Sequence, residues 1–279
     1  MLQIGEMMSW LNLVMRSLHV IAGVMWIGHL WFFNFVNAEL AKTYDAASQR
    51  RVVPELMPRA LYWFRWGAFF SLLTGLLLLR NVYYFGGLLL APESGFSMGF
   101  ANAIGMGTLL FAFVIYDLVW KLFAKAEIVG GLLSFLLIVG AACGLAQVLT
   151  GRAALIHVGG MFGTVMALNV WLRIWPNQRQ LITAAKSGSA PDPTALATAA
   201  LRSKHNTYLS VPVLFLMISN HYPTMLYGLA DDKVSLPVVV ATLVGIGWVI
   251  TKLLYLKSAS KAPARYEKPA RRHESPART

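Results

Sequence analysis

Long uninterrupted apolar runs constrain this chain more than any other feature of its sequence. The run GLLSFLLIVGAACGLAQVL at residues 131–149 carries no charge and exceeds the roughly 18 residues needed to cross a bilayer. It lacks the in-out alternation of a transmembrane β-strand. Only 13% of the 279 residues are charged, against about 25% in a soluble domain. We therefore predict an all-α, polytopic membrane helix bundle.

About seven transmembrane helices can be marked along the chain. Each can cover the roughly 30 Å of the hydrocarbon core at 1.5 Å per residue. They occupy residues 9–36, 61–85, 100–120, 127–149, 153–175, 207–229 and 234–256. The longest polar connections are predicted at 37–60 and 176–206. We expect a transmembrane domain over residues 1–256 and a disordered, basic cytoplasmic tail over 257–279, which is rich in Pro, Lys and Arg.

The distribution of Lys and Arg predicts the orientation of the bundle. Connections 37–60, 118–126, 172–206 and 252–279 hold four, two, five and eight of them. The connections on the opposite side hold one each, which are Arg80, Arg152 and Lys233. The positive-inside rule then places the N-terminus outside and the C-terminus in the cytoplasm. The net charge of +12 thus reflects topology, so we expect a lipid bilayer and no nucleic acid as partner.

Three histidines within predicted spans are the first candidates for function. Ionisable side chains inside a membrane are costly and often functional. With the predicted topology, His19, His157 and His221 all lie within about 15 Å of the outer edge. Imidazoles from different helices can ligate the iron of haem b, and three together suit copper or zinc. The structural alternative is that each imidazole hydrogen-bonds to a neighbouring helix.

Three further residues bear on this predicted site. Asn220 precedes His221 in a polar segment just before Pro223, and could line a polar cavity or bind carbonyls freed by the proline. Arg16, three residues before His19, could bind an anionic substrate or a haem propionate, or simply reach the interface. The single cysteine, Cys143, excludes an internal disulfide and covalent haem c in this chain.

Three segments carry a family resemblance. RSLHVIAGVMWIG (16–28), HVGGMFGTVMALNVWLRIWPNQR (157–179) and KHNTYLSVPVLFLMISNHYP (204–223) resemble the signature segments of the membrane-bound urate hydroxylases, the urate oxidase N-terminal domain family. The resemblance implies an integral membrane oxidoreductase of the bacterial inner membrane that converts urate, a small planar substrate, to 5-hydroxyisourate without flavin. In that family a cytochrome c domain follows the helices and receives the electrons.

Site residues are expected within the family motifs and among the three histidines near the outer edge. The expected catalytic residues are His19, His157, Asn220 and His221. The expected cofactor-binding residues are His19, His157, His221 and Arg16, with the three histidines as ligands of the metal. The expected substrate-binding residues are Asn177, Gln178, Arg179, His205 and Asn206. Because no CxxCH motif is present, we expect a separate periplasmic cytochrome c. The alternative is a non-catalytic membrane subunit or small-solute carrier with the same fold.

Overall fold

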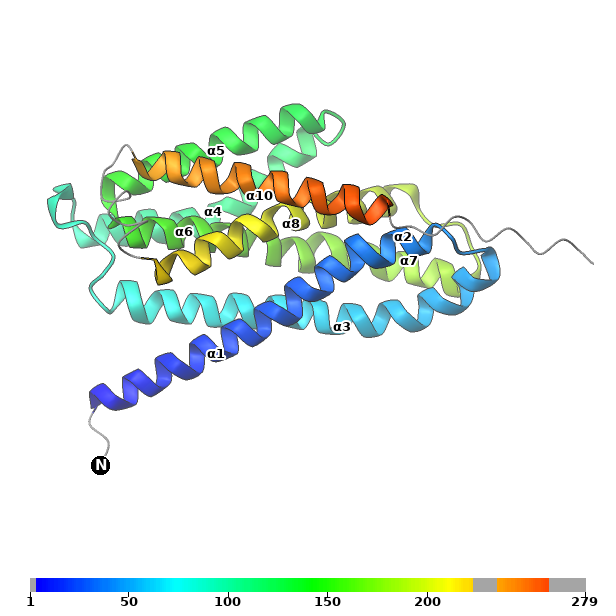
Figure 1. The fold of residues 1–279 in the computed structure, drawn as a ribbon, viewed down its shortest axis with the longest axis horizontal. Coiled ribbons are helices and arrows are strands. Elements are labelled where there is room, and N and C mark those ends of the chain that lie inside the picture. Colours follow the sequence, from blue (N-terminus) through cyan, green and yellow to red (C-terminus); the bar gives the residue numbers. More distant parts are fainter. Residues whose placement is uncertain (1–3, 223–234, 261–279) are drawn as a thin grey trace, which may run out of the picture.

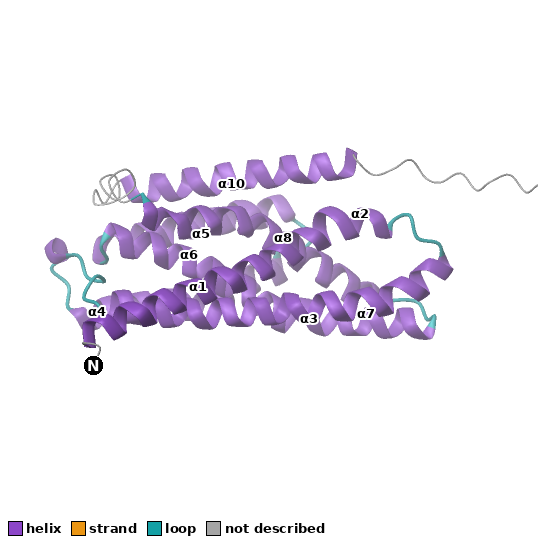
Figure 2. Ribbon diagram, turned by 60° about the horizontal axis from the view of Figure 1, so that its bottom comes forward, coloured by secondary structure: helices purple, strands orange, loops and turns teal. Residues whose placement is uncertain are grey.

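The computed structural model describes residues 4–222 and 235–260, which form one bundle of roughly aligned helices (Figures 1 and 2). Apart from one isolated β-bridge, these residues contain no strand. The α-helices are α1 (Ile4–Trp31), α2 (Ala38–Ala41), α3 (Ala46–Leu79), α4 (Met98–Leu122), α5 (Glu127–Val148), α6 (Gly151–Asn169), α7 (Trp175–Ser187), α8 (Pro193–Ile218) and α10 (Ser235–Ser260). The predicted all-α architecture is confirmed.

Six helical stretches of the described chain are long and apolar enough to cross a membrane. They are Gly5–Ala41, Ala46–Tyr84, Met98–Leu122, Glu127–Val148, Gly151–Ser187 and Ser235–Ser260. The remaining predicted span, 207–229, begins within α8 and continues into residues outside the described part of the chain. The chain is thus a multi-pass membrane protein.

Three of these stretches contain π-helical segments that join two α-helices or extend one. These are η1 (Phe32–Asn37) between α1 and α2, η2 (Arg80–Tyr84) after α3, and η4 (Val170–Ile174) between α6 and α7. Well under 1% of residues in globular proteins are π-helical, and π-helical turns often occur at functional sites. Side chains from or directly beside η2 and η4 contribute to both candidate sites described below.

The prediction that residues 37–60 and 176–206 form polar loops is wrong, because most of these residues are helical. The Asp45 side chain accepts a hydrogen bond from Ser48 N and starts α3. Gly188 ends α7 in the left-handed conformation, and Asp192 caps α8, so only residues 188–192 separate these helices. Hydrophobicity marked only the membrane part of each helix. Polar continuations of the same helices lacked an apolar run and resembled loops.

The predicted start of the tail at residue 257 also needs correction. Helix α10 continues to Ser260, since no proline or glycine interrupts it, and the Ser258 hydroxyl donates a hydrogen bond to the Phe35 carbonyl. The rest of the predicted tail lies outside the described residues.

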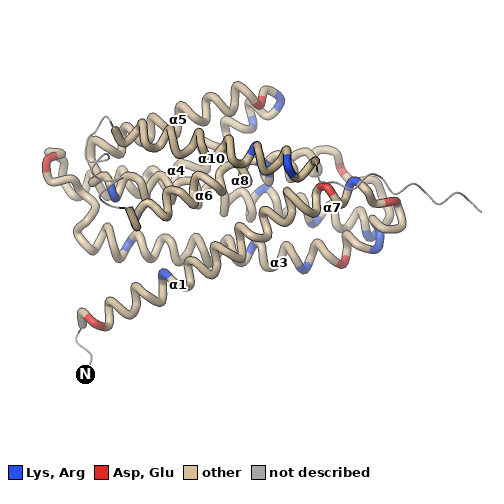
Figure 3. The backbone as a smooth tube through the Cα atoms, in the orientation of Figure 1, with Lys and Arg blue, Asp and Glu red and all other residues tan. Residues whose placement is uncertain are grey.

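Helix α6 lies at the centre of the bundle and positions side chains at both of its ends. In its apolar window 83% of residues are buried, against 17–33% in the other five stretches. Lys and Arg gather toward the end where α7 finishes and α8 begins (Figure 3). We call this the inner end, which the sequence predicts to be cytoplasmic, and the opposite one the outer end.

Candidate functional site

His157 of α6 lies toward the outer end, fully buried among neighbouring helices. Its Nδ1 atom is 2.7 Å from the Ala153 carbonyl oxygen, so Nδ1 must carry the proton and donate. The Tyr84 hydroxyl, 2.9 Å away, then donates to Nε2. A Cβ on Gly105 of α4 would lie 3.0 Å from this Nε2 and 2.5 Å from the Tyr84 oxygen. Both imidazole nitrogens are therefore satisfied in a tightly packed place.

His19 of α1 is held by a different part of α3. Its Nδ1 atom lies 2.9 Å from the Ser71 carbonyl oxygen and 3.1 Å from the Thr74 hydroxyl. A Cβ on Gly75 would be 3.1 Å from the imidazole Cε1. The imidazole thus fastens α1 against α3, as the structural alternative for a membrane histidine expects.

The predicted haem and metal ligands do not converge on one centre. Ser71 and Thr74, which hold His19, precede Tyr84, the partner of His157, by 13 and 10 positions, or about 15–20 Å along a helix. The two imidazoles therefore do not face opposite sides of one macrocycle, and Tyr84 and Gly105 fill the space beside His157 Nε2. Haem b does not fit between them in this arrangement.

The other members of the predicted outer site are also apart. His221 is exposed in the short helix Ser219–His221, and the side chain of Asn220 lies outside the described part. Arg16 is exposed on α1, while His29 Nδ1 donates to the Met25 carbonyl of its own helix. Within residues 4–222 and 235–260, no three His, Cys, Asp or Glu side chains could hold a metal ion together.

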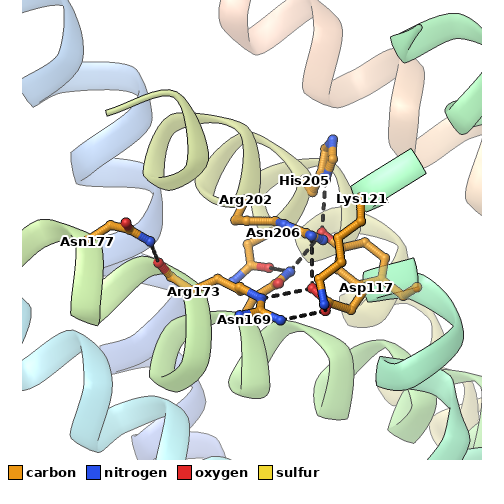
Figure 4. Close-up of polar contacts among 9 residues, drawn as sticks. Asp117, Lys121, Asn169, Arg173, Asn177, Arg202, His205 and Asn206 are labelled. Atoms are coloured by element: carbon orange, nitrogen blue, oxygen red, sulfur yellow. Dashed lines mark hydrogen bonds and ion pairs between the residues drawn. The ribbon is translucent and has the colours of Figure 1, made fainter. Parts of the chain in front are cut away.

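The inner end holds a more connected polar site around Asp117 of α4 (Figure 4). Arg173 of η4 donates from Nε and Nη2 to its two carboxylate oxygens, at 2.9 and 2.5 Å. Arg202 of α8 donates from Nη2 at 2.9 Å, and Lys121 Nζ lies 3.0 Å away. Three cations thus surround one carboxylate, which leaves two positive charges uncompensated within the cluster.

An amide pair and the ion cluster both contact Tyr116, since the Arg202 guanidinium lies 5.0 Å from the centre of its ring. Asn169, the last residue of α6, donates from Nδ2 to the Asn206 Oδ1 atom and to the Tyr116 hydroxyl, both at 2.9 Å. Asn206 in turn donates to the Met166 carbonyl. The Tyr116 oxygen lies 2.8 Å from Nδ1 of His205. Three helices, α4, α6 and α8, therefore meet through one hydrogen-bonded chain.

Two polar atoms in this site are buried without a hydrogen-bond partner in the described structure. They are Nη1 of Arg202 and Oδ1 of Asn169. The Arg202 side chain is 4% exposed, and Asn169 is fully buried. An unpaired buried donor or acceptor costs about 1–3 kcal/mol, and more when it is charged. One donor of a cation and one amide acceptor thus remain unsatisfied within the described bundle.

The predicted substrate-binding residues divide into two groups. His205 and Asn206 belong to the inner site. Asn177 points away from it and donates to the Arg173 carbonyl of its own helical stretch (Figure 4). Gln178 is half-buried, and the exposed Arg179 lies 5.9 Å from the Trp175 ring. The three α7 residues are therefore not joined to the amide pair.

Sequence reasoning did not assign roles to Asp117, Arg173, Arg202 or Tyr116. Asp117 carried a usable signal, because it is the acidic residue of the apolar stretch Met98–Leu122, and a buried carboxylate needs a cation. Its partners lie 56 and 85 positions away. Only the folded bundle reveals them.

A cavity of about 480 Å³ adjoins the inner site. It lies between α4, α5, α6, α8 and α10, and Tyr116 and His205 form part of its wall. Most of the other lining side chains are aliphatic or aromatic. Tyr116 therefore separates a charged site from an apolar one.

The fold and the inner site define a class: a multi-pass helical membrane protein with a buried, cation-rich polar cluster. The sequence profile of the family described as "Urate oxidase N-terminal" matches residues 5–53 and 44–270. Because the match covers most of its length, the chain belongs to the urate oxidase N-terminal family. No curated protein and no solved structure matches it.

Proposed function

We propose that this chain is a membrane-bound oxidoreductase of the bacterial inner membrane that hydroxylates urate to 5-hydroxyisourate. In that reaction urate and one water give 5-hydroxyisourate, two protons and two electrons. A separate cytochrome c would accept the electrons in two single steps. Family membership supports the reaction class, and the inner site supports the substrate class.

The unpaired Arg202 and Asn169 atoms are the observation that carries this proposal. Urate is a planar anion at neutral pH, and its edges alternate between carbonyl oxygens and ring N–H groups. A guanidinium N–H binds the first kind of group, and an amide oxygen accepts from the second. The excess positive charge around Asp117 stabilises a bound anion.

The other inner residues position these two groups. Asp117 fixes the Arg202 guanidinium through Nη2 and leaves Nη1 for substrate. Asn206 fixes the Asn169 amide, because it accepts from Nδ2 and so directs Oδ1 away. Arg173 and Lys121, whose side chains are 31% and 61% exposed, are the most accessible members of the ion cluster. These two side chains would have to move for substrate to reach the buried Arg202 and Asn169 atoms.

Urate-dependent reduction of added cytochrome c by the purified full-length protein tests the proposal. Asn169→Ala should lower kcat/KM at least about fivefold, since the loss of one recognition contact costs about 1–3 kcal/mol. Asn177→Ala is the matched control, because its amide binds only a carbonyl of its own helix. It should leave kcat/KM within about twofold.

Two results would overturn the proposal. One is the absence of urate oxidation by the unsubstituted protein with any one- or two-electron acceptor. The other is an equal effect of Asn169→Ala and Asn177→Ala. Saturable urate binding that needs Asn169 but produces no oxidation would favour the second candidate, a small-solute carrier built on the same unpaired atoms.

A further inference from the structure

The apolar cavity has an elongated shape and a gradient of polarity. Its wall on α4 extends from Thr108 to Trp120, which is about 18 Å along a helix. Toward the inner end the wall holds His205, Lys204 and Glu127; toward the middle of the bundle it holds residues such as Ala141. The aromatic lining residues are Phe111, Tyr116, Trp120, Phe162, Tyr208 and Trp248.

The polar end presents a flat aromatic surface and a hydrogen-bond donor. The centroids of the Trp120 and His205 rings are 3.9 Å apart. Because Asn169 donates to the Tyr116 oxygen, the Tyr116 O–H can donate to Nδ1 of His205. Nε2 then carries the imidazole proton. This nitrogen points away from the ion cluster (Figure 4), and His205 lines the cavity.

The cavity borders the lipid side of the bundle. Phe111 and Ile128, which line it, are 63% and 81% exposed, and both belong to helices that can cross the membrane. Helix α5 occupies the edge of the bundle in Figure 1. A hydrophobic molecule could therefore enter from the bilayer without crossing water.

The charge and polarity of the lining residues limit which class of molecule this cavity can bind. Urate has polar atoms around its whole edge, so an apolar cavity would leave them unsatisfied. A phospholipid headgroup would need a free cation, but Lys204 Nζ is paired with the Glu127 carboxylate at 2.5 Å. A molecule with a carbonyl-bearing ring and a long hydrocarbon tail suits the cavity, because the ring matches the polar end and the tail matches the apolar remainder.

We propose that this cavity binds a prenylquinone of the bilayer. The ring would lie against Trp120 with one carbonyl accepting from His205 Nε2, and the tail would extend along the apolar wall toward Ala141. Pockets of about 300–1,000 Å³ suit ligands of this size. Here Tyr116 is a shared wall, because its hydroxyl contacts Asn169 while its side chain lines the cavity.

The redox role of this site rests on the proposed function. Urate, one water and one quinone give 5-hydroxyisourate and one quinol, with the quinone taking the two electrons and two protons that urate and water release. Atoms and charge balance without another reactant. The quinone would then be a membrane acceptor beside cytochrome c.

Quinone retention tests the binding site without any activity measurement. The full-length protein, purified in mild detergent, should retain about one extractable quinone per chain. Gly131→Leu should reduce this amount at least about threefold. Gly131 lines the cavity, and a Cβ there meets no atom within 4 Å, so the larger side chain occupies cavity space without a backbone clash.

Gly140→Leu is the matched control on the same helix. Gly140 is exposed, its added Cβ also meets no atom within 4 Å, and it does not line the cavity. It should retain as much quinone as the unsubstituted protein. Equal retention in the two variants, or only phospholipid acyl chains in the extract, would overturn the proposal.

A second measurement separates this inference from the proposed function. With urate as donor, decylubiquinone reduction should fall at least about threefold in Gly131→Leu while cytochrome c reduction stays within about twofold. If Gly131→Leu lost both activities while Gly140→Leu kept both, the proposed role of quinone as electron acceptor would be overturned. If the protein oxidised urate with neither acceptor but Gly131→Leu still reduced quinone retention, only the proposed function would be overturned.

Discussion

Nδ1 of His205 lies 2.8 Å from the hydroxyl oxygen of Tyr116, although the two residues are 89 positions apart in the sequence. The same oxygen accepts from Asn169, which is joined to Asn206. One phenol therefore links the buried amide pair to the imidazole of the apolar cavity. Under the two proposals above, this phenol contacts both binding sites.

Replacing this phenol with phenylalanine tests the link. Tyr116→Phe keeps the ring but removes a hydrogen-bond partner from both His205 and Asn169. We expect a loss of about 1 kcal/mol in the free energy of unfolding, or about 2–4 °C in Tm. Circular dichroism of the detergent-purified protein measures it. Tyr62→Phe, at an exposed ring, should leave Tm unchanged, and equal shifts in both variants would contradict the prediction.

Neutralising Asp117 should destabilise the inner end strongly. Asp117→Asn leaves the buried Arg202 guanidinium without its carboxylate, and breaking a buried ion pair costs about 3–5 kcal/mol. Partial exposure of Arg173 and Lys121 should place the effect at the lower end of that range. Glu55→Gln, in an exposed pair with Arg59, is the control and should not change Tm. Adding Arg202→Met to Asp117→Asn should recover part of the loss, and no recovery would argue against this pair.

The sequence predicted the membrane bundle because long apolar runs report membrane spans directly. It did not predict which side chains come together in a site, since the depth of a residue along its helix does not determine which neighbouring helix its side chain contacts. His19 and His157 were placed in one layer, yet Ser71 and Tyr84 hold them at different stretches of α3 and η2. Long-range pairs such as Asp117 with Arg202 follow from helix packing and have no local signal.

The predicted orientation can be tested with single cysteines. In a Cys143→Ser background, Glu93→Cys and Ser189→Cys place exposed thiols at the outer and inner ends. A membrane-impermeant maleimide should label Glu93→Cys in intact spheroplasts and Ser189→Cys only after the membrane is permeabilised. The reverse pattern would invert the topology and would move the Asp117 cluster to the periplasmic side.

The absorption spectrum of the purified protein tests the haem prediction made from the sequence. His157 Nε2 faces Tyr84 and Gly105, and His19 is held by a separate stretch of α3, so neither imidazole is free to ligate a shared iron. We expect no Soret band in the oxidised or dithionite-reduced protein. Any Soret band would contradict this expectation. Its loss in His19→Ala and in His157→Ala, but not in His29→Ala, whose imidazole binds a carbonyl of its own helix, would identify His19 and His157 as the iron ligands. That result would mean that α1, α3 and α6 separate enough to admit a macrocycle.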